Sequence, residues 1–455
     1  MHVVFGFCKK YYQKVRENFS YYKVSNQNKN FLLLNYLFWI LFYRRFLSYM
    51  FALPLLCIYF ILYPFIKFRF IKLIGSAIGH YCITTELLLS ELDTLPNDKF
   101  INIFYLEQNF FEPSVCNLYL HKMWRRIIFI LPLACSCIAD SLNKLIMFFL
   151  SEKTYGMGGS KVRYERRWAR DLQGCFKNKP PHLKFTEKEH QLAEAILQKI
   201  NIIPNDRYVC LFARSSAYRK GHPNWHYPER NVDISTYMKA AHFLADKGYY
   251  VLRMGKTVDD CIEENNPRII DYSRSSIRSD FMDIYLSANC YFFMTTGSGL
   301  DGIPQIFRKP ILYTNCFILA HIAMWYPHYL FIPKSVCFTK SNQLLAFKEQ
   351  MHFFLTHPDY IAKKGFHISD YIKKHGLQFI DNTEKEILEV VEEMEARMSN
   401  SWQETKTNQL LQEKFWDVFS THFKPADYHG KVALPRENIF IKIGANFLNT
   451  YQNLL

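Results

Sequence analysis

Several motifs that would assign these 455 residues to a familiar class of enzyme or metal protein are missing from the chain. No Asp-x-Asp occurs, so a common carboxylate pair for Mg²⁺ or Mn²⁺ is absent. No GxSxG occurs, which leaves a serine hydrolase of that type unsupported. The twelve cysteines are scattered and form no CxxC pair, so neither a disulfide framework nor a zinc site is indicated. We interpret them as small buried thiols in a reducing compartment.

Two partial motifs also fail on inspection. The stretch Met254–Thr257 reads MGKT, but Tyr250 stands where the first glycine of a phosphate loop belongs, so a nucleotide triphosphatase is not indicated. His222 and His226 have the spacing of two zinc ligands on a helix. Pro223 lies between them and no glutamate follows His222, so we expect a loop there and no metal.

Acidic residues are scarce at one end of the chain. The net charge is +15, and residues 1–72 hold eleven Lys and Arg but one acid, Glu17, which gives 11 − 1 = +10. Because the basic character belongs to one end, it does not indicate nucleic acid as a partner. Hydrophobic residues make up 49% and charged residues 21%, as in a globular protein long enough for two or three domains.

An apolar segment follows the basic residues. It covers Phe31–Ile66 and is interrupted by Arg44 and Arg45. Its first piece, Phe31–Tyr43, is too short to span a bilayer, whereas the second, Phe46–Ile66, has 21 residues without a charge and is long enough.

The surroundings of this segment argue against a simple membrane span. Lys and Arg flank Phe46–Ile66 on both sides, and Pro54 and Pro64 lie within it. A re-entrant or interface-lying anchor, with its basic residues on anionic headgroups, accounts for both flanks. The alternative is a pair of helices buried in the fold or against a partner chain.

Strand-like and helix-like segments alternate in the middle of the chain. Strands are expected at 208–213, 249–255, 268–273, 291–296 and 311–314, with helices at 234–248 and 279–289. This alternation predicts a parallel sheet covered on both faces. Such sheets bind ligands at the carboxyl ends of their strands. Residues 69–93 read as strand, glycine loop and helix, 101–108 as a strand, and 384–398 as an amphipathic helix.

The tripeptide Gly297-Ser298-Gly299 falls where an expected strand ends and a helix begins. Backbone N–H groups and the helix dipole at such a point can bind an anion, and glycines let a phosphate come close. The alternative is a simple turn between strand and helix.

Four arginines lie near the ends of expected strands of the same sheet, and Thr296 precedes the glycines. They are Arg214, Arg253, Arg274 and Arg278. Together they could clamp a diphosphate, although each alone could equally form a surface ion pair.

A second glycine loop, Gly75–His80, follows the first strand of the amino-terminal part. His80 is a candidate general base because imidazole titrates near neutrality. Glu86 could orient His80 or act in its place. The alternative is that His80 has a structural role, which is common for a lone histidine.

Several long segments resemble a bacterial family of glycosyltransferases that is associated with surface-polysaccharide gene clusters and for which a GT-B-like fold is expected. They are residues 211–220, 229–256, 280–293, 295–315 and 411–419, with IGHYCITTEL (78–87) in the amino-terminal part. The resemblance runs from about residue 69 to the end. One departure is that Ser215 follows Arg214 where the family pattern has an aspartate, so a catalytic role at that position would be lost.

The resemblance implies two Rossmann-like domains that face a cleft. The expected regions are 1–68, a basic and apolar membrane anchor; 69–185, an amino-terminal acceptor domain; 186–380, a carboxyl-terminal nucleotide-sugar domain; and 381–455, a helical region. The donor-binding set would be Arg214, Arg253, Arg274, Arg278, Thr296, Gly297, Ser298 and Gly299, with His80 and Glu86 as catalytic candidates.

The expected activity is transfer of a sugar from a nucleotide-sugar donor to a glycan or lipid-linked acceptor at the cytoplasmic face of the inner membrane. Arginines would stabilise the leaving diphosphate, so we expect neither a metal nor another cofactor. The alternative is a membrane-associated binding or scaffold protein of polysaccharide assembly without catalysis, and Ser215 favours it.

Overall fold

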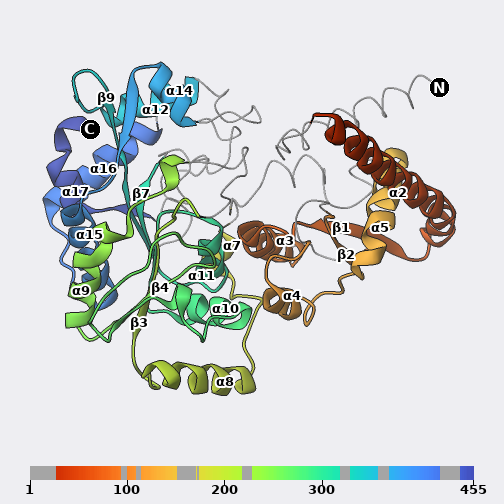
Figure 1. The fold of residues 1–455 in the computed structure, drawn as a ribbon, viewed down its shortest axis with the longest axis horizontal. Coiled ribbons are helices and arrows are strands. Elements are labelled where there is room, and N and C mark those ends of the chain that lie inside the picture. Colours follow the sequence, from red (N-terminus) through yellow and green to blue (C-terminus); the bar gives the residue numbers. More distant parts are fainter. Residues whose placement is uncertain are drawn as a thin grey trace.

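A seven-stranded parallel sheet forms the centre of the molecule, with strand order β11-β8-β7-β6-β3-β4-β5 (Figure 1). The computed structural model describes residues 27–93, 100–108, 114–150, 171, 174–217, 228–317, 328–356, 368–420 and 441–455. The strands are β3 (Tyr208–Phe212), β4 (Tyr250–Arg253), β5 (Ile269–Ile270), β6 (Phe293–Thr295), β7 (Ile311–Cys316), β8 (Tyr329–Pro333) and β11 (Lys442–Ile443). Their short apolar runs are largely buried on both faces, as the sequence predicted for β3, β4, β5, β6 and β7.

Helices cover both faces of this sheet (Figure 1). On one face lie α9 (Met238–Asp246), α15 (Glu384–Met398), α16 (Lys406–Ser420) and α17 (Ala445–Thr450). On the other lie α10 (Asp280–Asn289) and α11 (Gly302–Ile306), and α8 (Glu187–Leu197) precedes β3. The expected mixed α/β fold with a parallel sheet is therefore confirmed. The carboxyl-terminal region, expected to be helical, also supplies the edge strand β11, which pairs with β8.

A small antiparallel sheet follows β8 directly. It pairs β9 (Ser335–Phe338) with β10 (Leu377–Ile380). The helices α12 (Phe347–Thr356) and α14 (Ile368–Lys374) lie beside it (Figure 1). These elements did not show in the sequence pattern.

The amino-terminal region is smaller than a Rossmann-like domain in its described residues. The parallel strands β1 (Lys67–Leu73) and β2 (Phe100–Leu106) form a two-stranded sheet, extended by a single bridge between Phe104 and Ile130. Its helices are α3 (Thr85–Leu92), α4 (Leu118–Trp124) and α5 (Ser136–Phe149), and the short α7 (Cys175–Asn178) follows. A cleft between two equivalent domains stays a prediction.

This region packs directly on the α10/α11 face of the large sheet. Helix α4 contacts α10, and a π-helical turn, His80–Thr84, contacts α11. One continuous hydrophobic core runs through both regions. The described parts of the two regions therefore form one packed body.

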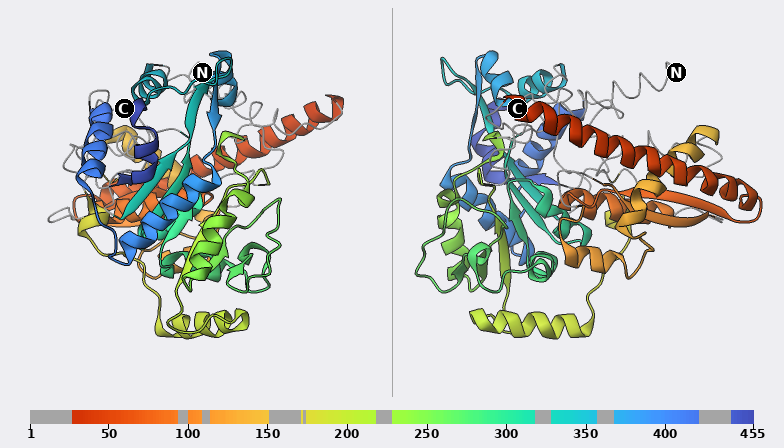
Figure 2. Two further views of the ribbon diagram at one scale, coloured as in Figure 1. Left: turned by 90° about the vertical axis from the view of Figure 1, so that its left-hand side faces the viewer. Right: turned by 45° about the vertical axis from the view of Figure 1, so that its right-hand side comes forward.

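The apolar amino-terminal segment forms one helix instead of the two expected pieces. Helix α2 (Gln27–Leu62) continues through Arg44, Arg45 and Pro54 and ends before Pro64 (Figure 2). Within it, Phe42–Leu62 is long and apolar enough to cross a membrane, with a mean hydropathy of 1.8, and 22% of it is buried. A separate small cluster of apolar side chains joins α2 to α5.

Candidate functional site

The topology of the large sheet singles out the carboxyl ends of β3 and β6. From β3 the chain proceeds outward to β4 and β5, then returns to the other side of β3 to form β6, β7 and β8. Ligands of doubly wound sheets bind where the strand order reverses in this way. The loops at this switch point begin at Ala213 and Thr296, and the Arg214 N–H donates to Thr296 Oγ1 at 3.3 Å. Two of the predicted segments are thus joined there.

Gly297 and Gly299 are glycines for different structural reasons. Gly297 has a φ of 78°, and a Cβ added to it would meet nothing within 4 Å. A Cβ on Gly299 would lie 3.2 Å from the Gly79 nitrogen, and one on Gly79 would lie 2.9 Å from Gly299 Cα. The glycine at 299 therefore lets the amino-terminal glycine loop pack closely against the large domain.

Three backbone N–H groups of this turn already donate to nearby side-chain oxygens. The pairs are Gly297 N with Thr295 Oγ1 at 3.1 Å, Ser298 N with Asp301 Oδ2 at 3.0 Å, and Leu300 N with Ser298 Oγ at 3.2 Å. The following helix α11 has five residues, so its dipole is small. Affinity for an anion at this point would depend on side-chain cations more than on the helix terminus.

One such cation, Arg230, was not selected from the sequence. Its guanidinium donates to the Gly297 carbonyl and lies over the Phe317 ring, 5.6 Å from the centroid. Arg230 follows the residues 218–227 that lie outside the described part of the chain. No periodic or motif signal marks it, because its partner is 67 residues further along the chain.

A buried carboxylate lies at the same turn and was also missed. Asp301 is 6% exposed and caps the turn through Ser298 N. Burial raises the pKa of Asp301 to about 7, an effect that nearby Arg230 opposes. The Ser-x-x-Asp spacing of a capping box was the signal in the sequence that could have identified it. A carboxyl that titrates near neutrality is frequent at functional sites.

Two of the predicted arginines have carboxylate partners. Arg253 is 1% exposed and lies 3.1 Å from Asp271. Arg278 lies 2.9 Å from Asp283. Arg274 is exposed and donates to the carbonyl of Asp259. Arg253 is the last residue of β4, whereas Arg274 ends a short helical turn after β5 and Arg278 follows it. Their role in donor binding stays a prediction, and the ion pairs give two of them a structural role.

His80 lies beside the switch-point turn. It starts the π-helical turn and follows Gly79, which touches Gly299. Burial lowers the pKa of His80, and Glu107 acts in the opposite direction. Burial thus favours the neutral imidazole, which is the form that can accept a proton. The structure brings the two glycine loops together, and His80 directly follows Gly79 in the chain. Its role as a base stays a prediction.

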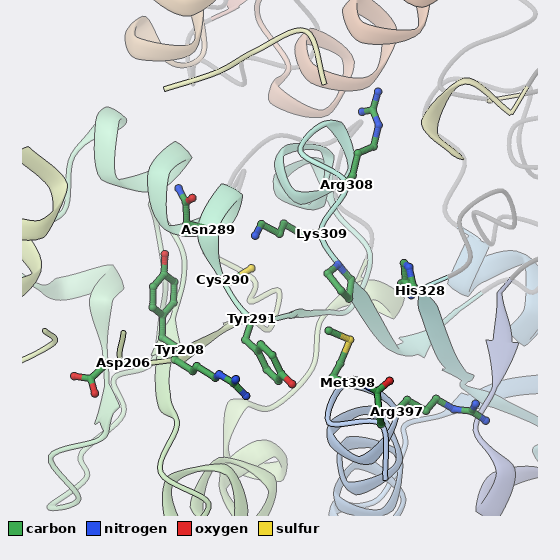
Figure 3. Close-up of a pocket in the computed structure, with 13 residues that line it drawn as sticks. Asp206, Tyr208, Asn289, Cys290, Tyr291, Arg308, Lys309, His328, Arg397 and Met398 are labelled. Carbon is green, nitrogen blue, oxygen red and sulfur yellow. The ribbon is translucent and has the colours of Figure 1, made fainter. Parts of the chain in front are cut away.

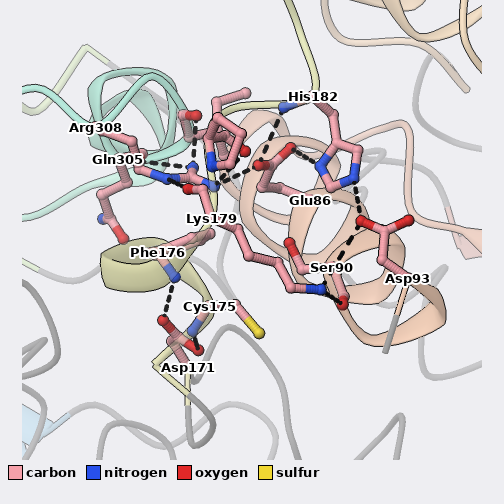
Figure 4. Close-up of polar contacts among 12 residues, drawn as sticks. Glu86, Ser90, Asp93, Asp171, Cys175, Phe176, Lys179, His182, Gln305 and Arg308 are labelled. Atoms are coloured by element: carbon pink, nitrogen blue, oxygen red, sulfur yellow. Dashed lines mark hydrogen bonds and ion pairs between the residues drawn. The ribbon is translucent and has the colours of Figure 1, made fainter. Parts of the chain in front are cut away.

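Glu86 lies in a different environment. It is fully buried, and its Oε1 lies 2.7 Å from Arg308 Nη2 (Figure 4). His182 Nδ1 lies 3.1 Å from the other oxygen, and the Glu86 carboxylate raises the pKa of His182. Arg308 follows α11, so this ion pair connects α3 to the large domain. The contacts assign Glu86 a structural role, and its catalytic role stays a prediction.

A cavity of about 540 Å³ opens at the opposite edge of the sheet (Figure 3). Its lining comes from the amino ends of β3, β6, β7 and β8 and from the end of α15, and includes Arg207, Tyr208, Lys309, His328 and Arg397. Because parallel sheets bind their ligands at the carboxyl edge, we place the candidate site at the switch point. Among the described residues, no group of three or more His, Cys, Asp or Glu is arranged to hold a metal ion.

Comparison with known proteins gave two similar structures. A family 9 glycosyl transferase from Veillonella parvula covers 72% of this chain and 97% of its own length, with 11% identity and a TM-score of 0.38. The ADP-heptose LPS heptosyltransferase II of E. coli covers 54% and 84%, with 13% identity and a TM-score of 0.28. No protein-family model and no curated protein matches the chain. Because both TM-scores are low, the proposal below rests on this chain's own residues.

Proposed function

We propose that the chain is a glycosyltransferase that takes its sugar from a nucleotide-sugar donor. The observation that carries the proposal is the meeting of three features at the switch point. These are the Arg214–Thr296 contact between the β3 and β6 loops, the Arg230 guanidinium on Gly297, and the packing of Gly79, the residue before His80, against Gly299. Residues 211–217 and 295–315, which belong to segments that resemble a glycosyltransferase family, contribute to this point.

The donor diphosphate would lie between the β3 and β6 loops. Arg214 and Arg230 would stabilise the charge that develops on the leaving diphosphate, and fixed cations in a partly buried site do this without a metal. Gly297 has open space where a Cβ would stand, so a phosphate can approach the backbone there. No Mg²⁺ or Mn²⁺ is required by this arrangement.

The acceptor hydroxyl would meet the donor beside His80. The neutral imidazole would take the hydroxyl proton while the oxygen attacks the anomeric carbon and the diphosphate leaves. The acceptor would be a glycan or a lipid-linked molecule. The apolar amino-terminal helix favours an acceptor that is held at a membrane. Such acceptors and cytoplasmic sugar nucleotides meet at the inner face of the cytoplasmic membrane, where we propose that the protein works in surface-polysaccharide assembly.

A non-catalytic scaffold is the second candidate, and one position favours it. Ser215 stands where the resembling family has an aspartate after the arginine. Its hydroxyl accepts from the Asp259 N–H at 3.4 Å, which is a contact within the fold. Without a catalytic aspartate at this position, the protein would keep its fold but lose the transfer reaction.

Nucleotide binding separates the two candidates. The purified chain is melted with UDP, GDP, CMP and TDP in turn, with and without EDTA. If the chain is a glycosyltransferase, at least one nucleotide should raise the melting temperature, and EDTA should leave this shift unchanged. The chain is then incubated with a panel of nucleotide sugars, and release of free nucleotide is measured. Absence of both a shift and turnover would overturn the proposal in favour of the scaffold.

A further inference from the structure

Among its described side chains, from Ile40 to Leu62, helix α2 is largely apolar on all sides, and a narrow stripe of these side chains is covered. Ser48, Ala52, Leu56 and Tyr59 are buried. The remaining directions expose large apolar side chains, namely Tyr43, Phe46, Leu47, Met50, Phe51, Leu53, Leu55, Ile58, Phe60 and Ile61. An exposed apolar surface of this extent marks a contact with lipid or protein in a soluble chain.

The covered stripe of α2 lies along α5. Arg45 forms an ion pair of 2.8 Å with Asp140, the Ser48 and Ser141 hydroxyls are 2.7 Å apart, and Leu56 and Tyr59 join Leu142 and Ile146 in one apolar cluster. The contacts between α2 and α5 therefore run from Arg45 to Phe60, within the Phe42–Leu62 segment.

This packing is incompatible with α2 crossing a bilayer. Helix α5 carries Asp140 and Lys144, and its other side contacts β1 and β2. If α2 spanned the membrane, α5 and the attached two-stranded sheet would enter the hydrocarbon with it. Open sheet edges and charged side chains are not tolerated there without protein or water around them. The helix must instead lie along the surface, with α5 on its aqueous side.

The exposed apolar surface continues past α2. The Phe60 and Phe149 rings meet edge to face, with centroids 6.0 Å apart. Phe149 is 58% exposed, its neighbour Phe148 is 82% exposed, and Phe65, just after α2, is 85% exposed. Aromatic side chains favour the boundary between lipid headgroups and acyl chains. The end of α5 thus belongs to the same surface as α2.

Charge identifies the occupant of this surface as anionic lipid. The exposed Arg44 lies among the apolar side chains of α2 and lines an apolar groove of about 610 Å³ between α2 and the start of α5. The first 72 residues carry a net charge of +10. An exposed arginine beside an apolar surface, in a segment of this net charge, matches anionic headgroups over acyl chains.

We propose that α2, Phe65 and the Phe148–Phe149 end of α5 form one in-plane membrane contact, embedded in a single leaflet that contains anionic lipid. This contact goes beyond the proposed enzymatic activity and does not depend on it.

The first test uses vesicles and the full chain. Vesicles of phosphatidylcholine with phosphatidylglycerol are sedimented with wild type, with Phe148→Ser/Phe149→Ser, and with the control Leu192→Ser on α8. Leu192 is 52% exposed and lies on α8, outside the proposed contact. Substitution is preferable to deletion of α2, which would uncover Leu142 and Ile146. We expect the double variant to bind at least about tenfold more weakly and the control to bind normally. Equal binding by all three would overturn the role of α5.

The second test establishes the orientation of α2. The full chain carries one epitope at its amino terminus and another at its carboxyl terminus, and both are probed with protease in inverted and right-side-out membrane vesicles. An in-plane helix predicts that both epitopes lie on the same side. Epitopes on opposite sides would overturn the proposal in favour of a span. A protein that stays off vesicles and forms a dimer through this surface, measured by light scattering, would overturn lipid as its occupant.

Discussion

The loops after β3 and β6 differ from those after β4 and β5, although both sets lie at the carboxyl edge of one sheet and both carry arginines. After β4 and β5, Arg253 and Arg278 form ion pairs with Asp271 and Asp283. At the switch point, Arg230 donates to the carbonyl of Gly297. A carboxylate partner neutralises a guanidinium, so Arg253 and Arg278 are committed to ion pairs within the fold.

The difference teaches that an arginine after a strand is not by itself a sign of anion binding. The partner that decides the role of Arg253 stands 18 residues later in the chain. Arginines that hold the fold should affect stability when removed, whereas arginines of the site should affect ligand binding. The predictions that follow test this division, and they begin with the largest expected effect.

Removal of Glu86 should damage the fold most. The Glu86→Ala variant leaves Arg308, which is 10% exposed, without its buried carboxylate partner. Breaking such a pair costs roughly 3–5 kcal/mol of the free energy of unfolding. Chemical denaturation measures this loss. Glu86→Gln is the matched control, since it keeps the shape of the side chain. A folded Glu86→Gln variant that binds donor but transfers no sugar would make Glu86 catalytic and contradict the structural role.

Arg253 and Arg214 should respond in opposite ways. Arg253→Ala breaks a buried ion pair and should lower stability by roughly 3–5 kcal/mol. Arg214→Ala should weaken nucleotide binding by roughly 1.5–3 kcal/mol through loss of a charged hydrogen bond. Denaturation and calorimetric titration are run on both variants. The division fails if Arg253→Ala is as stable as wild type and yet loses nucleotide binding.

His80→Ala should leave donor binding intact and slow transfer by about 100-fold or more, as expected for loss of a general base. The pH profile of the wild type sharpens this test. Because burial lowers the pKa of His80, the imidazole stays neutral until the pH falls below its usual value of 6.5. Transfer should therefore be constant near pH 7 and fall only in more acidic buffer. An unchanged rate in the His80→Ala variant would remove the base from the mechanism.

The fold of the large domain could be predicted from the sequence to a considerable extent. The apolar runs at 208–213 and 311–314 became β3 and β7, because strands buried on both faces need continuous apolar stretches. Strands β8 and β11 were missed. Strand β11 has two residues, which is too short for any periodicity.

The candidate site could be predicted only in part. The two glycine loops were found, since glycine after a strand is a local signal. That they touch each other could not be seen, because Gly79 and Gly299 meet only when the two regions pack. The Glu86–Arg308 pair joins residues 222 positions apart, and no local pattern encodes such a distance. Local chemistry was therefore predictable, whereas the partner of each charge was not.

The two glycines of the turn should separate packing from ligand approach. Gly299→Val should clash with Gly79 and lower stability by roughly 1–3 kcal/mol, as overpacking does. Gly297→Asn should fold normally, because asparagine tolerates a positive φ and the space around position 297 is open. Its added side chain should nevertheless obstruct a diphosphate. Normal nucleotide binding by a folded Gly297→Asn variant would show that nothing approaches the backbone there.

The smallest expected effect concerns Asp301 and depends on pH. Its folded-state pKa of about 7 lies above the ordinary value of 3.8, so the native state binds this proton more tightly than the unfolded chain does. The resulting stabilisation is complete below the unfolded pKa and is lost as the pH rises through about 7. Asp301→Asn stays neutral at every pH. Between pH 6.5 and 8 the wild type should therefore lose on the order of 1 kcal/mol more stability than the variant does. His80 does not confound the comparison, because both proteins carry it and its contribution cancels in the difference. Melting curves of both proteins across that range measure the difference.

Nucleotide binding adds a second measurement, since an ionised Asp301 beside the switch-point turn should repel a diphosphate. Wild-type affinity should then fall as the pH rises through 7, and the Asp301→Asn variant should show a flatter profile. Parallel pH profiles of stability and binding in the two proteins would mean that Asp301 is already ionised when folded and that the turn carries no titrating carboxyl.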